Sequence, residues 1–236
     1  MYTTLQRITL NLNLVICLCW LFLLFRFALL YPLTGTRYLA GGIADFHIGV
    51  LAVTSIYEVA LWLLIFKRVP KESNETSQFV YRLPRPRGLT LLMTILIRST
   101  LCLVVLHYPK LTRFREYPFL ILAQSIRESF KWLYQVYKVR YFSNTSPLLN
   151  WSKYLSFVFA WPIETVLIGS LSWKGLNFIQ DPSQVGYIEE FRPFEKYLDW
   201  TIKLLLVVGA TWSWKVFVGK SDGRKIMPQI AQKKDD

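Results

Sequence analysis

Residues 10–31 read LNLNLVICLCWLFLLFRFALLY, a largely apolar stretch in which Arg26 is the one charged residue. A helix of about 20 such residues crosses the hydrocarbon core of a bilayer, because each residue adds about 1.5 Å of rise. The stretch is long, and no small-residue cleavage site follows it, which argues against a removable signal peptide. It therefore predicts a retained membrane helix near the start of the chain.

Five further apolar blocks follow, separated by short segments that hold most of the proline, glycine and charge. They cover residues 47–66, 88–108, 119–137, 148–171 and 200–218. Their hydrophobic residues run continuously rather than alternating, which favours helices over the strands of a membrane barrel. The sequence thus predicts an all-α membrane protein, a six-transmembrane-helix bundle, formed by one domain over 1–236 with a short tail at 219–236.

The composition excludes several other classes of protein. Of the 236 residues, 53% are hydrophobic and 18% charged, whereas soluble domains carry about 25% charged residues. The net charge of +13 does not indicate nucleic-acid binding, because the basic residues lie between apolar blocks and form no basic face. Three cysteines and two histidines form neither a disulfide framework nor a ligand pattern. No metal, cofactor or nucleic-acid partner is expected, and His47, near a block end, is expected at the membrane interface.

The basic residues are distributed unequally between the two sides of a six-span bundle. One side carries sixteen: one in 1–10, six in 67–87, three in 138–153 and six from Lys215 onward. The other side carries seven. Because cytosolic loops are enriched in Lys and Arg, both termini are expected in the cytosol, and membrane lipids are the first expected partners.

The chain ends in Lys233-Lys234-Asp235-Asp236. Lysines at the third and fourth positions from the end resemble the dilysine retrieval signal of endoplasmic-reticulum membrane proteins, which acts on a cytosolic tail. The expected location is therefore the endoplasmic-reticulum membrane. The sequon at Asn74 lies on the predicted cytosolic side, and we expect it to carry no glycan.

Ionisable side chains inside the predicted spans are the first candidates for function, because each costs about 2.5–3.5 kcal/mol at a helix centre. They are Arg26, Glu58, Arg98, Arg127, Glu128, Lys131, Glu164 and Lys203. Arg127 and Lys131 are four residues apart and share a helix face, so the fourth span has a polar stripe. The stripe has two explanations: interhelical ion pairs, such as Glu58 or Glu164 with Lys131 or Arg98, or a polar pocket that binds a headgroup.

The third to fifth spans resemble the 3-hydroxyacyl-CoA dehydratase family of the endoplasmic reticulum, also called protein-tyrosine-phosphatase-like proteins. The family's fourth helix reads W-S-I-T-E-x-x-R-Y-x-x-Y, and residues 124–135 here read QSIRESFKWLYQ. The family's fifth helix reads W-L-R-Y, six residues, then Y-P-x-G-x-x-x-E. Here Trp151-Ser152-Lys153-Tyr154 is followed at the same spacing by Trp161-Pro162. The third span, with Arg98, is similar to the family's T-T-x-x-Q-x-x-S-R segment.

The resemblance implies loss of water from a 3-hydroxyacyl-CoA during the elongation of very-long-chain fatty acids. The family uses the Tyr of Y-P and the Glu seven residues later, and these positions are Trp161 and Ile168 here. Neither side chain exchanges a proton at neutral pH. The implied function is a catalytically impaired, dehydratase-like protein, with acyl-CoA and elongation enzymes as its partners.

Two alternatives remain open from the residues. An active dehydratase could use a relocated acid/base pair, Glu164 and Tyr154, with Glu128 and Lys131 of the neighbouring span completing a pocket. Alternatively, the chain could be a non-enzymatic structural subunit of a membrane complex.

Overall fold

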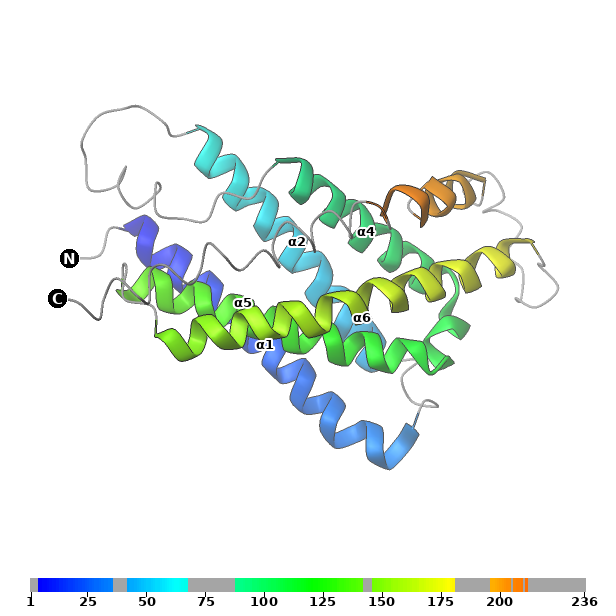
Figure 1. The fold of residues 1–236 in the computed structure, drawn as a ribbon, viewed down its shortest axis with the longest axis horizontal. Helices are drawn as coiled ribbons and strands as arrows, with labels where there is room; N and C mark the ends of the chain where they lie inside the picture. The colour runs from blue at the N-terminus through cyan, green and yellow to red at the C-terminus, as the bar shows by residue number, and fades with distance from the viewer. Residues whose placement is uncertain are drawn as a thin grey trace.

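The computed structural model describes residues 4–35, 42–67, 88–141, 146–180, 196–204, 206–209 and 211. Throughout these residues the chain is helical, with short turns and no strand (Figure 1). The predicted all-helical class is confirmed for this part of the chain.

Five helices coincide with the first five predicted spans. They are α1 (Thr4–Thr34), α2 (Ala44–Lys67), α4 (Gly88–His107), α5 (Glu116–Tyr141) and α6 (Pro147–Gln180). A 3-10 helix, η3 (Pro109–Arg113), joins α4 to α5. The sixth predicted span begins within a further helical segment, described at 196–204, 206–209 and 211.

The observed ends of α1 and α6 both lie beyond the ends predicted from hydropathy. The α1 helix ends at Thr34, and Gly35 follows with φ 59°, the left-handed conformation that commonly terminates helices. The α6 helix continues to Gln180, well past the predicted end at residue 171. Hydropathy falls there because Lys174 and Asn177 follow, yet these residues do not break a helix.

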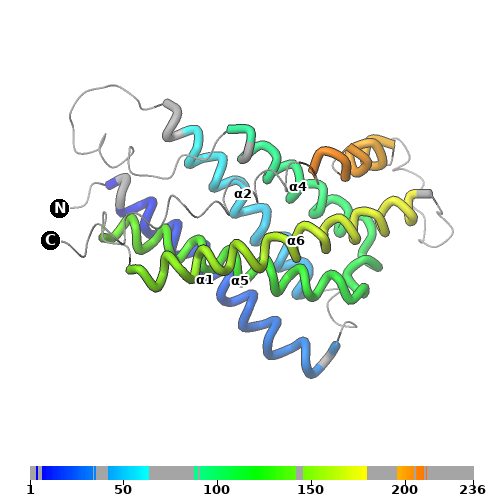
Figure 2. Tube along the Cα trace, in the orientation of Figure 1, coloured from blue at the N-terminus to red at the C-terminus, as the bar shows by residue number. Residues whose placement is uncertain are grey.

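Successive helices run in alternate directions, so α1, α4 and α6 begin at the end where α2 and α5 finish (Figures 1 and 2). The most extensive helix contacts are those of α5 with α1 and with α6. The α2 and α4 helices pack against each other on another side of the bundle. This arrangement makes α5 the central helix.

The outer surface of the bundle is strongly apolar. Among the described residues, three helical segments are long and apolar enough to cross a membrane: Arg7–Leu33, Ala44–Leu63 and Pro147–Ile179. The apolar part of α4, Leu91–His107, is shorter. Large hydrophobic side chains of α1 and α6, such as Phe25 and Phe159, are more than 60% exposed, as expected of side chains that face lipid.

The interior combines apolar packing with buried polar groups. Trp20 and Leu23 of α1, Leu51 of α2, and Leu120 and Trp132 of α5 lie in one apolar core cluster and are almost completely buried. A second cluster joins Val104 and Leu111 to Leu176, Leu198 and Ile202, and so fixes the last helical segment against the ends of α4 and α6. The polar groups that the first cluster encloses define the candidate site.

Candidate functional site

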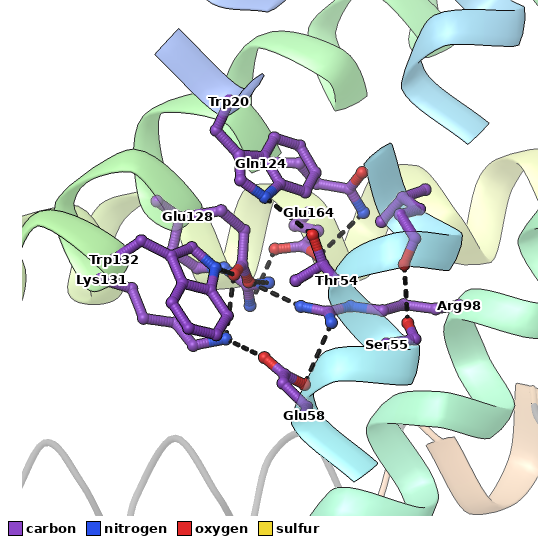
Figure 3. Close-up of polar contacts among 12 residues, drawn as sticks. Trp20, Thr54, Ser55, Glu58, Arg98, Gln124, Glu128, Lys131, Trp132 and Glu164 are labelled. Atoms are coloured by element: carbon purple, nitrogen blue, oxygen red, sulfur yellow. Dashed lines mark hydrogen bonds and ion pairs between the residues drawn. The ribbon is translucent and has the colours of Figure 1, made fainter. Parts of the chain in front are cut away.

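A continuous network of charged and polar side chains occupies the interior of the bundle (Figure 3). Its members come from α2, α4, α5 and α6, and most come from one stripe of α5. The interval of three or four residues between Gln124, Arg127 or Glu128, and Lys131 places these side chains along one side of the helix. The polar stripe predicted for the fourth span therefore faces other helices of the same chain.

Glu128 is the centre of the network. Its Oε1 accepts hydrogen bonds from Arg98 Nη2 and from Arg127 Nη2, each at 2.7 Å. Its Oε2 accepts from Lys131 Nζ at 2.9 Å and from Trp132 Nε1 at 3.1 Å. The side chain is only 1% exposed, so these four donors replace the water that a carboxylate normally binds.

Glu58 of α2 closes a ring with the same cations. Its Oε2 accepts from Arg98 Nη1 at 3.1 Å, and its Oε1 accepts from Lys131 Nζ. The prediction that Glu58 pairs with Arg98 or Lys131 is confirmed, because it pairs with both. Arg98 thereby joins α4 to α2 and α5 at one point.

Glu164 of α6 has different partners from those predicted. It forms an ion pair with Arg127, with 3.0 Å between Glu164 Oε2 and Arg127 Nη1. Its Oε1 accepts from Gln124 Nε2 at 2.9 Å. The predicted pairing of Glu164 with Lys131 or Arg98 is wrong, because Arg127 lies nearer on the α5 face that meets α6. The guanidinium of Arg127 also lies 4.9 Å from the ring centroid of Trp161, within cation–π range.

His47 extends the network toward the start of α5, and its position at the level of the membrane interface stays a prediction. The ring is completely buried, with Nε2 2.7 Å from Gln124 Oε1 and Nδ1 3.1 Å from Tyr117 Oη. Gln124 uses its amide nitrogen on Glu164, so its oxygen must accept, and His47 Nε2 carries the proton. His47 Nδ1 then accepts from the Tyr117 hydroxyl. The two rings also pack edge to face, with their centroids 5.7 Å apart.

The network is electrically neutral. Among the residues that the structure describes, it holds the carboxylates of Glu58, Glu128 and Glu164 and the cations of Arg98, Arg127 and Lys131. Apart from Lys131, which is 29% exposed, these side chains are at most 12% exposed. A neutral set of charges is favoured in a low-dielectric interior, because an uncompensated buried charge is strongly destabilising. The arrangement can therefore stabilise the bundle without bound ions.

The remaining predicted residues lie outside this network. Tyr154 is half-buried in the first half of α6, and Ile168 packs against the apolar core. Lys203 pairs with Asp199 at 2.6 Å in the last helical segment. The retrieval lysines Lys233 and Lys234 lie outside the described residues, as does Asn74.

Sequence reasoning missed four participants: His47, Tyr117, Gln124 and Trp132. Gln124 lies seven residues after Tyr117 and seven residues before Lys131. Seven residues are about two helical turns, so the three side chains share one helix face. This spacing was a usable signal for extending the stripe in both directions. No signal in the sequence brings His47 of another helix onto that stripe.

In the described part of the chain, no group of three or more His, Cys, Asp or Glu side chains is arranged to hold a metal ion. No protein-family model matches this chain. No curated protein and no solved structure matches it either.

Proposed function

We propose that this chain is a six-span protein of the endoplasmic-reticulum membrane that has the bundle of the 3-hydroxyacyl-CoA dehydratases but no longer catalyses dehydration. A structural ion pair occupies the region where the family places its acid and base. The protein would then act in very-long-chain fatty-acid elongation by binding acyl-CoA or elongation enzymes.

One observation carries this proposal: four positions that depart from the family motifs, two on α5 and two on α6, contact one another. On the ungapped register, Gln124 stands at the family's Trp, Arg127 at its Thr, Trp161 at its Tyr and Glu164 at its Gly. Gln124 and Arg127 both bind Glu164, and Arg127 also lies against Trp161. These four departures therefore lie together on the facing sides of α5 and α6, while Ile168, at the family's Glu, packs against the apolar core.

The positions of Glu164 and Tyr154 do not favour a relocated catalytic pair. Both lie on α6, ten residues apart, which separates them by about 15 Å along the axis and turns them about 80° from each other. Dehydration acts on adjacent carbons of the substrate. The Glu164 carboxylate is also already bound by Arg127 and Gln124, which hold it as a structural anion.

Complementation tests the loss of catalysis. We would express the chain in cells depleted of their own dehydratase and measure 3-hydroxyacyl-CoA and very-long-chain fatty acids. We expect no rescue by the abundant, correctly located protein. Rescue that disappears in Glu164→Gln would overturn the proposal and support the relocated site.

Co-purification separates the proposed role from that of an unrelated structural subunit. We expect elongation enzymes to be recovered with the tagged full chain, and not with another tagged six-span protein of the same membrane. Recovery of one stoichiometric complex that lacks elongation enzymes would favour the structural-subunit alternative.

The proposed six-span topology rests on the alternating directions of the described helices and on the unequal distribution of basic residues between the segments that join the predicted spans. Glycosylation mapping tests it. We expect an acceptor sequon introduced within 181–195 to gain a glycan while Asn74 stays unmodified. A glycan on Asn74 would reverse the orientation. Replacing Lys233 and Lys234 with alanine should release the protein from the endoplasmic reticulum.

A further inference from the structure

We propose that a lipid bilayer contacts α6 between Trp151 and Trp173, with one headgroup layer at each tryptophan, and that the charged network therefore lies at the middle of the membrane. This depth rests on the membrane-spanning part of the proposed function. It depends neither on the orientation of the bundle nor on the proposed loss of catalysis.

The exposed face of α6 is an apolar stripe. Large side chains recur on it at intervals of three, four or seven residues, so they lie along one side of the helix. Each is at least 43% exposed: Trp151, Leu155, Phe159, Ile163, Val166 and Trp173. The buried side chains Ser156, Ala160 and Glu164 follow another face of the helix. The α6 helix thus presents one apolar stripe to its surroundings, with a tryptophan at each end.

The length of the stripe matches a bilayer. Trp151 and Trp173 are 22 residues apart, which corresponds to about 33 Å along the helix axis. The hydrocarbon core of a bilayer is about 30 Å thick, and tryptophans gather at the headgroup level on both sides of it. A basic residue follows each tryptophan closely, Lys153 at one end and Lys174 at the other. The stripe therefore has the length and the two ends of a surface that spans a membrane.

Exposed aromatic side chains of another helical segment lie near the Trp173 end. Tyr197 and Trp200 are 74% and 75% exposed. Leu198, between them, belongs to the same apolar cluster as Leu176 of α6, so the segment lies beside the last turns of α6. Together these rings form an aromatic belt of the kind that marks a membrane interface.

The charged network lies near the middle of the stripe. Glu164 follows Trp151 by 13 residues and precedes Trp173 by nine. It is therefore about 3 Å along the axis from the midpoint of the stripe. An ionised side chain costs most at the centre of a bilayer, which is the depth at which a neutral network is favoured most strongly.

The same network lies halfway along two further helices. Arg127 is 11 residues from both Glu116 and Lys138, and between these two the other charges of α5 belong to the network. Arg98 lies ten residues after the start of α4 (Gly88–His107) and nine before its end. Ion pairs join these midpoints to each other and to that of α6. Three helices thus place the network at one depth, midway between the two headgroup layers.

Quenching of tryptophan fluorescence by brominated lipids tests this depth. The full chain is reconstituted in phosphatidylcholine that is brominated either near the headgroup or near the ends of the acyl chains. Trp151→Phe and Trp173→Phe should each remove emission that the shallow bromines quench most strongly. Phe159→Trp should add emission that the deep bromines quench most strongly, because residue 159 lies about 12 Å along the axis from Trp151.

The matched control is Tyr197→Trp, because Tyr197 and Phe159 are comparably exposed aromatic residues, at 74% and 66%. The emission that this control adds should be quenched most strongly by the shallow bromines. Stronger quenching of Phe159→Trp by the shallow bromines would overturn the proposed depth and leave the spanning topology intact. Emission of Phe159→Trp that neither lipid quenches would show that lipid does not cover the stripe, which also overturns the proposal. Rescue in the complementation test would contradict the loss of catalysis and leave this depth unchanged.

Discussion

Arg98 Nη2 of α4 donates to Glu128 Oε1 of α5 at 2.7 Å, and both side chains are at least 95% buried. This pair joins the two helices at the point where Glu58 of α2 also binds Arg98. Three helices therefore meet at one guanidinium. Arginine suits this position because its planar guanidinium presents two separate nitrogens, one to each carboxylate.

Replacing Glu128 with glutamine should destabilise the protein severely. The change leaves Arg98, Arg127 and Lys131 with one carboxylate too few inside the bundle. Breaking a buried ion pair from one side typically costs about 3–5 kcal/mol. Thermal unfolding in detergent, followed by tryptophan fluorescence, would measure the loss. The control is Glu116→Gln, which removes a more exposed pair with Lys174 and should cost less than about 1 kcal/mol. Equal losses in the two variants would contradict the central role of Glu128.

Arg127 and Glu164 should be energetically coupled. Arg127→Met leaves Glu164 without its cation, and Glu164→Met leaves the buried network with one positive charge in excess, whereas the double variant keeps the network neutral. We expect the double variant to be more stable than the sum of the single losses predicts, with a coupling of about 0.5–3 kcal/mol. A double-mutant cycle of unfolding free energies measures this coupling. Simple additivity would show that the 3.0 Å ion pair does not hold α5 to α6.

The hydroxyl of Tyr117 should stabilise the fold through His47. Tyr117→Phe leaves His47 Nδ1 as a buried acceptor without its donor, which typically costs about 1–3 kcal/mol. The matched control is Tyr197→Phe, at a residue that is 74% exposed and should tolerate the loss of its hydroxyl. If the two variants unfolded at the same temperature as the wild type, the Tyr117–His47 hydrogen bond would contribute nothing.

The Glu116–Lys174 pair should make a small, acid-sensitive contribution to stability. Lys174 Nζ donates a hydrogen bond to Glu116 Oε1 at 2.5 Å and lowers the pKa of that carboxyl below its usual value of 4.5. The unfolded chain then binds this proton more readily than the folded protein. The stabilisation is therefore complete above the unfolded pKa and is lost as the pH falls through the folded pKa.

Melting temperatures measured between pH 7 and pH 3 would test this dependence. The difference between the wild type and Glu116→Gln should shrink as the pH falls, and it should shrink with added salt at pH 7, because the pair is partly exposed. A difference that grows in acid would mean that Lys174 does not lower the pKa of Glu116 in the folded protein.

Hydropathy located the helices well because their apolar runs are long, and even α5, with three charges in its predicted span, was found. The need to neutralise buried charge correctly paired Glu58 with Arg98 and Lys131. The ion pair between Glu164 and Arg127 depends on how α5 and α6 are rotated about their axes. No pattern within one helix fixes that rotation. The contacts of His47 were missed for a related reason: one of the residues that bind it, Tyr117, lies outside the predicted span 119–137.

The neutral network also constrains how the chain is made. Glu58 and Arg98 precede α5 in the sequence, but Glu164 follows it, so the network lacks one carboxylate until α6 has been synthesised. The charges of α5 make it a poor substrate for independent insertion by the translocon. Its partition into lipid would therefore be a cooperative event, guided by α2 and α4 and completed only when α6 has been synthesised.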